Sequence, residues 1–163
     1  MSGHLPHNAA MSFPLDDATI AGIHAAFADG SLTAVALVEA CLARIAAYDK
    51  AGPELRAILA LNPDALAIAA RCDAEFRERR GDVGPLHGIP VLLKDNFQTH
   101  DMPTTAGSVL LRDWRPREDA FTVDRMRRAG AILLGKCNMQ ELARGGVAAS
   151  SLGGQVRNPY DLT

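Results

Sequence analysis

Residues 84–96 read GPLHGIPVLLKDN, and this stretch decides how the rest of the chain is interpreted. Its apolar run IPVLL (89–93) is short and bounded by turn-forming and polar residues, which predicts a buried strand. Proline has no N–H to donate to a sheet, so Pro90 must lie early in that strand or on a sheet edge. Lys94 then stands at the carboxyl end of the strand.

Two helices and a strand are predicted before a third helix. Residues 16–26 favour a short helix, and Thr33 is a candidate N-cap for the next one. Residues 56–61 (RAILAL) predict a strand. The Asn62-Pro63-Asp64 triplet (62–64) then offers a cap, a proline for the first helical position and an early acidic residue. The second helix has apolar residues at helical spacing: Leu37, Val38, Cys41, Leu42, Ile45 and Tyr48.

The chain continues in the same alternating manner after Lys94. Residues 99–119 are expected to be irregular, a helix to begin near residue 120 and stop at Gly130, and a strand to follow over 131–134. Alternation of helices and strands predicts the α/β class. About three strands are evident, which would form a parallel or mixed sheet with two poorly covered edges.

Composition indicates an ordinary globular protein. The chain has 163 residues, 48% hydrophobic and 22% charged, with a net charge of −2. Residues 1–14 are expected to form a flexible lead-in without features of a secretion signal, and residues 15–163 to belong to a single domain. Basic residues are mixed with acidic ones and aromatic residues are few, so no direct nucleic-acid partner is expected.

Cysteine usage and hydropathy bear on the location of the protein. The odd number of widely spaced cysteines, Cys41, Cys72 and Cys137, favours reduced thiols over a disulfide framework and therefore a cytoplasmic protein. The most apolar longer segment, 34–48, is too short to span a bilayer, so no membrane association is expected.

Lys94 is the first candidate for chemistry. A lysine serves as a base near neutral pH only when burial or neighbouring groups lower its pKa well below the ordinary value of about 10.4. An apolar strand offers such surroundings. The alternative is that the methylene groups pack while the ammonium group extends to water.

Three ordered blocks change the balance between these two interpretations. GPLHGIPVLLKDN is followed by DMPTTAGS (101–108) and by RRAGAILLGKCNMQELA (127–143). Together they resemble the amidase signature family, the Ser-Ser-Lys amidases, over residues from about 32 to the end. The resemblance implies an α/β/α fold with a mixed central sheet, of which this chain would be an incomplete, amino-terminal portion. It also implies that Lys94 is the catalytic base.

The mechanism implied by this resemblance needs two serines. The neutral lysine deprotonates a bridging serine, which activates a nucleophilic serine, and attack on an amide carbonyl gives an acyl-enzyme that water hydrolyses. In the family both serines follow an NPYD turn, which here is 158–161. We therefore expect the chain to end before the catalytic serines and to be inactive alone. Ser150 and Ser151 precede that turn and are expected to be structural or to line a pocket.

Further site residues follow from the same resemblance. Asp95 and Asn96 would orient the Lys94 amine or fix the turn after the strand, and direct contact of a carboxylate with the base would oppose its use. A substrate channel is expected near Thr104, Thr105, Gly107, Ser108, Met139, Ala143 and Gly145. The histidines show no ligand spacing, so neither a metal site nor a cofactor is expected.

The segment GAILLGKC (130–137) also fits part of a phosphate-binding loop. Its middle residues are strand formers where exposed N–H groups are needed, and Cys137 offers no hydroxyl for Mg²⁺, so nucleotide binding is rejected.

Three functions stay open. The first is an amidase that acts on a small amide substrate, for which a homodimer of the complete enzyme is compatible with the resemblance. The second is the subunit of an amidotransferase that amidates misacylated tRNA and shares the same blocks; the 100–108 segment (HDMPTTAGS) favours the amidases weakly. The third is a non-catalytic interaction module on the same scaffold, against which the uncovered sheet edges argue.

Overall fold

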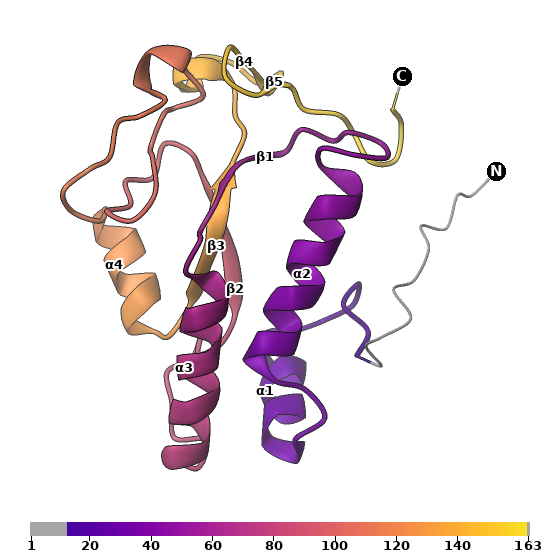
Figure 1. Cartoon of the computed structure of the whole chain (residues 1–163), viewed down its shortest axis with the longest axis vertical. Coiled ribbons are helices and arrows are strands. Elements are labelled where there is room, and N and C mark those ends of the chain that lie inside the picture. Colours follow the sequence, from indigo (N-terminus) through magenta and orange to yellow (C-terminus); the bar gives the residue numbers. More distant parts are fainter. Residues whose placement is uncertain (1–12, 163) are drawn as a thin grey trace.

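A computed structural model describes residues 13–162, and most of the predicted lead-in, residues 1–12, lies outside this range. Figure 1 shows a small sheet with α4 on one side and the long helix α2 on the other. The α/β class and the mixed sheet predicted from the sequence are confirmed.

The first two helices begin at threonine caps. In α1 (Ile20–Asp29) and α2 (Ala34–Tyr48), the hydroxyl groups of Thr19 and Thr33 each accept a hydrogen bond of 3.0 Å from the backbone N–H three residues on. The Thr33 cap is confirmed. The helix predicted over 16–26 begins later and ends later, because Thr19 caps it and Gly30, at a φ of 77°, terminates it.

The start of α3 (Ala65–Glu78) differs from the prediction. Asp64 is the N-cap but makes no side-chain capping bond, and Pro63 precedes the helix instead of occupying its first position. The side chain of Asn62 is buried, where it donates to the Leu133 carbonyl at 2.9 Å and accepts from the Asp64 N–H at 3.0 Å. Asn62 therefore ties the helix start to the sheet, which local sequence does not reveal.

The sheet consists of β1 (Ile58–Leu61), β2 (Pro90–Lys94) and β3 (Ile132–Cys137) in the order β1-β3-β2. The central strand β3 pairs antiparallel with β1 and parallel with β2. Pro90 is the first residue of β2, an edge strand, as its missing N–H requires. The strand predicted over 131–134 extends to Cys137.

Apolar side chains cover both faces of the sheet. On one face, Ile132 and Leu134 of β3 pack against α2 and α3. On the other, Leu133 and Leu93 pack against Val123 of α4 (Phe121–Arg128). The helix α1 joins a further cluster with α2 and Ile89, the residue before β2.

The remaining segments lie at the carboxyl end of β2, where Figure 1 shows loops and a small hairpin. The connection predicted to be irregular contains one short 3-10 helix, η1 (Val109–Leu111). A second, η2 (Glu141–Ala143), precedes the hairpin of β4 (Ala149–Ser150) and β5 (Gly154–Gln155). The predicted turn at 158–161 closes with a hydrogen bond of 3.2 Å from the Asp161 N–H to the Asn158 carbonyl.

Candidate active site

Lys94 is the last residue of β2, and its backbone is held while its side chain is exposed. It pairs with Cys137 in the sheet, and its carbonyl accepts the N–H of Phe97 at 3.0 Å. Within residues 13–162 its ammonium group has no hydrogen bond and no ion pair. The side chain at the end of the predicted strand is thus available to a group outside the described residues.

The apolar surroundings expected for Lys94 are not found within residues 13–162. Leu92, two residues earlier and therefore on the same face of β2, is 40% exposed. Leu93, on the opposite face, is buried in the cluster with Val123. The difference has a simple cause: β2 is an edge strand, and the described helices leave that part of its surface uncovered.

Asp95 is 1% exposed and is engaged by a loop, not by Lys94. Its Oδ2 atom accepts the backbone N–H groups of Thr105 at 3.0 Å and Gly107 at 3.3 Å, and also the Thr105 hydroxyl. Its carbonyl accepts the N–H of Ala106 at 3.1 Å. The loop therefore wraps around this carboxylate. Asn96 is exposed.

The other oxygen of Asp95 faces a buried lysine that the sequence motifs did not identify as part of the site. Lys136 of β3 is 0% exposed, and its Nζ atom lies 3.3 Å from Asp95 Oδ1. The same ammonium group donates to the Pro103 carbonyl at 3.1 Å and the Thr104 hydroxyl at 2.9 Å. The ammonium group thus makes two hydrogen bonds and one ion pair, because Asp95 Oδ1 lies within ion-pair distance but accepts no hydrogen bond from the described residues.

Burial lowers the pKa of Lys136, although the negative charge of Asp95 opposes this shift. A lowered pKa is what a base needs, yet Lys136 is closed off from solvent and its ammonium group is held by two hydrogen bonds and an ion pair. Of the two lysines, Lys94 is therefore the one whose ammonium group is accessible. A lysine inside an apolar strand, as Lys136 is in β3, indicates a buried ion pair. Residue spacing in the sequence does not show that its partner is Asp95.

The residues predicted near a substrate channel fall into separate groups. Thr104, Thr105 and Gly107 surround the Asp95–Lys136 pair, and the Ser108 hydroxyl accepts the Leu110 N–H at the start of η1. Met139 is buried, with its carbonyl 3.3 Å from the place of a Cβ on Gly107. By contrast, two residues predicted with them are exposed after β3: Ala143 and Gly145.

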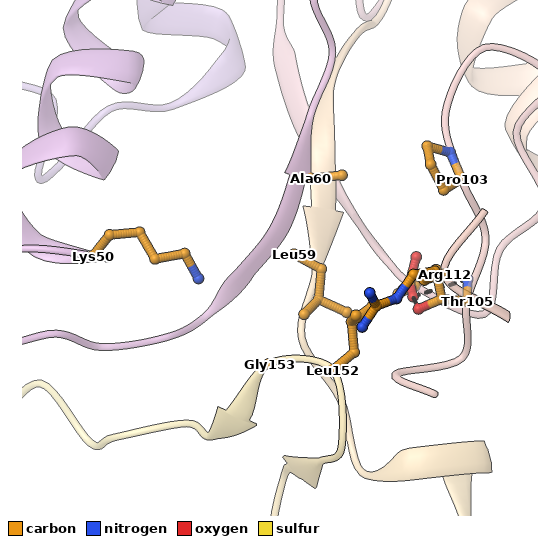
Figure 2. A pocket seen from close by; sticks show the side chains of 9 residues that line it. Lys50, Leu59, Ala60, Pro103, Thr105, Arg112, Leu152 and Gly153 are labelled. Atoms are coloured by element: carbon orange, nitrogen blue, oxygen red, sulfur yellow. Dashed lines mark hydrogen bonds between the residues drawn. The ribbon is translucent and has the colours of Figure 1, made fainter. Parts of the chain in front are cut away.

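A cavity of about 240 Å³ lies beside this loop. Figure 2 shows Leu59 and Ala60 of β1 on one side of it and Thr105 on the other. Asp95 lines the cavity, whereas Lys94 does not. Of the residues predicted near a substrate channel, Thr105 lines this cavity together with Asp95.

The Ser150-Ser151 pair is held by local hydrogen bonds. The Ser150 hydroxyl donates to Asn138 Oδ1 at 2.7 Å and accepts the Gly153 N–H at 2.9 Å. The Ser151 hydroxyl accepts the Val109 N–H at 3.1 Å. These bonds give both hydroxyl groups structural roles in the hairpin and its contact with η1.

Four further features of the described residues concern nucleotide binding, cysteines, metal ligands and membrane helices. Residues 130–137, which resemble part of a phosphate-binding loop, form the strand β3. Cys41, Cys72 and Cys137 are free thiols, of which Cys72 is buried and the others half-buried. Within residues 13–162, no three His, Cys, Asp or Glu side chains are grouped as metal ligands. Over the same range, no helix has the length and apolar character needed to cross a bilayer.

The described residues form an α/β domain in which an edge strand ends at an exposed lysine. The Amidase family model matches residues 36–163, so the chain belongs to this family, and the resemblance to amidase signature enzymes is confirmed. The chain is 45% identical over 145 residues to the A-type subunit of the glutamyl-tRNA(Gln) amidotransferase of Chloroflexus aurantiacus, covering 89% of this chain and 29% of that relative.

Solved structures show the same likeness. The peptide amidase of Stenotrophomonas maltophilia is 47% identical with a TM-score of 0.84, covering 91% of this chain and 31% of that protein. An amidase family protein of Bacillus anthracis is 36% identical with a TM-score of 0.82, covering 89% and 30%. The chain thus spans less than a third of the length of these relatives.

Proposed function

We propose that this chain is the amino-terminal part of a Ser-Ser-Lys amidase in which Lys94 is the catalytic base. One observation carries the proposal: Lys94 ends β2 with its backbone held in the sheet and its ammonium group free of partners within residues 13–162. A base must be fixed in position and still accessible to the proton that it removes. Lys136, the buried alternative, is fixed but inaccessible.

In the proposed reaction, this chain contributes one proton transfer, which Lys94 carries out. The neutral amine of Lys94 takes a proton from a bridging serine, which in turn takes the proton of a nucleophilic serine. That oxygen bonds to the amide carbonyl carbon, the C–N bond breaks, and the leaving amine takes up a proton. Water then hydrolyses the acyl ester. Both serines would be supplied by chain beyond Thr163, and the same added chain would cover the exposed face around Leu92.

The substrate proposed is a carboxylic amide. The likeness to a peptide amidase supports an amidated peptide or a similar carboxamide. The likeness to the A-type subunit of a glutamyl-tRNA(Gln) amidotransferase supports a second candidate, in which the same lysine serves glutamine hydrolysis for amidation of misacylated tRNA. A non-catalytic module is disfavoured, because the edge strands leave Leu92 and Leu61 exposed, whereas a free-standing module should cover its sheet edges.

Two proteins test the proposal: the complete gene product and the 163-residue chain alone. We expect the complete protein to release ammonia from amidated peptides, and Lys94→Met to lower kcat by about 10³-fold or more. The matched control is Arg128→Met, which removes an exposed cation paired with Asp124 on α4. It should leave kcat unchanged. The isolated chain should be inactive.

Each other outcome has a clear meaning. Full activity in Lys94→Met, or Lys94-dependent hydrolysis by the isolated chain, contradicts the proposal. Activity that requires misacylated tRNA and partner proteins decides for the amidotransferase candidate.

A further inference from the structure

We propose that Lys136 is a positioning residue for Lys94: by holding Asp95, it fixes the backbone at the end of β2 and prevents an unpaired carboxylate beside the base. The inference rests on the proposed role of Lys94 and deepens it. It assigns a function to a buried pair that the Ser-Ser-Lys relay itself does not use.

The first support is the burial of the pair and the set of contacts that Lys136 makes. Lys136 and Asp95 are 0% and 1% exposed, so solvent does not screen either charge. The ammonium group bridges three points: the Asp95 carboxylate at 3.3 Å, the Pro103 carbonyl at 3.1 Å and the Thr104 hydroxyl at 2.9 Å. One side chain of β3 thus joins the end of β2 to the loop that follows it.

The second support is that backbone hydrogen bonds fix the main chain at Lys94 and Asp95. The Asp95 N–H donates to the Cys137 carbonyl at 3.1 Å, and the Asp95 carbonyl accepts the Ala106 N–H at 3.1 Å. On the other side, the Lys94 carbonyl accepts the Phe97 N–H. The main chain that carries the base is therefore held from β3, from the loop and from its own turn, while its side chain stays free.

The third support is electrostatic. A buried carboxylate one residue from the base would favour the charged form of the lysine unless another cation balanced it. Lys136 supplies that cation. The other ionisable groups near this pair are Asp101, whose charge also acts on Lys136, and Cys137, and the cations Lys50 and Arg112 line the same cavity as Asp95. Burial, with Asp49 and Asp95 nearby, raises the pKa of the Cys137 thiol and so keeps it neutral.

The test uses the complete gene product and the acidic limb of its kcat/KM profile against pH. Lys136→Met leaves Asp95 unpaired, so we expect this limb to move to higher pH by about one unit, with kcat at neutral pH lowered about tenfold. Asp95→Asn removes the negative charge and should move the limb to lower pH. The double variant D95N/K136M, with both charges removed, should return the limb to its original place.

The matched control is Arg127→Met. Arg127 is a partly buried cation that pairs with Asp101 at 2.7 Å and Asp119 at 2.8 Å, so its removal also takes an ion-pair partner from Asp101, while Asp119 keeps its bonds to His100. A merely structural role for Lys136 predicts that both Met variants lose stability and that neither moves the limb. That result would overturn the inference.

If Lys136→Met does not fold, Asp95→Asn carries the test, and an unmoved limb in that variant overturns the inference equally. Failure of the role inferred for Lys136 can be distinguished from failure of the function proposed for Lys94. Retained activity in Lys94→Met removes the proposed function, whereas a Lys94-dependent enzyme whose limb does not respond to either charge removes only the role of Lys136.

Discussion

The chain contains three lysines, and each of them lies in different surroundings. Lys50 is mostly exposed, pairs with Asp49 at 3.2 Å and donates to the Ile58 carbonyl at 2.8 Å, so it secures the end of α2 against β1. Lys136 is buried among three acceptors. Lys94 has no such partners within residues 13–162. Residue type alone does not predict these surroundings, because each depends on what lies across the fold.

Asp119 offers a residue-scale prediction on pH. Burial opposes its ionisation, but hydrogen bonds from the backbone and ring of His100 and the charge of Arg127 outweigh burial and lower the pKa of Asp119. A lowered folded-state pKa contributes stability that is complete above the unfolded value of 3.8 and is lost as pH falls through the folded value.

We therefore expect Asp119→Asn to reduce the free energy of unfolding by a constant amount above about pH 5. The difference from the original protein should shrink as pH falls below 3.8. Urea unfolding of both proteins across the acidic pH range measures this difference in the free energy of unfolding. A difference that grows toward low pH would contradict the assignment.

At the scale of elements, the passage from α4 into β3 depends on one glycine. Gly130 has a φ of 93°, and a Cβ placed on it would lie 2.7 Å from the Cα of His87. Both a left-handed backbone and a close approach of two segments therefore require glycine here.

Gly130→Ala should destabilise the complete protein by about 2 kcal/mol or more, because it adds backbone strain and displaces the His87 segment. The matched control is Gly146→Ala, since a Cβ at Gly146 would meet nothing within 4 Å. Chemical denaturation of both variants measures the difference. Equal stability of the two would contradict this interpretation of the turn.

Local sequence predicted most elements but not all of their boundaries. The Thr33 cap and the early position of Pro90 follow from chemistry within a few residues, and both predictions are confirmed. The cap predicted at 62–64 is wrong in detail, because the side chain of Asn62 binds the Leu133 carbonyl of β3 instead. A contact between distant segments thus replaced a local one.

At the scale of the whole molecule, helices cover both faces of the central strand β3, whereas within residues 13–162 the edge strands are partly uncovered. The outer strand β2 presents Leu92 at 40% exposure, and β1 presents Leu61 at 41%. Unpaired strand edges with exposed apolar side chains promote association between chains.

We expect the isolated 163-residue chain to self-associate at micromolar concentrations and Leu92→Lys to reduce this association, because a charge on an edge strand opposes edge-to-edge pairing. Sedimentation velocity over a concentration series measures the effect. A chain that remains monomeric throughout, or a variant that associates equally, would contradict the prediction.

The sequence by itself determined the α/β class, the strand that ends at Lys94 and the family to which the chain belongs, because periodicity, caps and ordered motifs are local properties. Only the tertiary structure decided that Lys94 is exposed and that Asp95 pairs with Lys136. Strand order and register bring β3 beside the end of β2. Burial and charge pairing depend on such distant contacts, which no stretch of sequence contains.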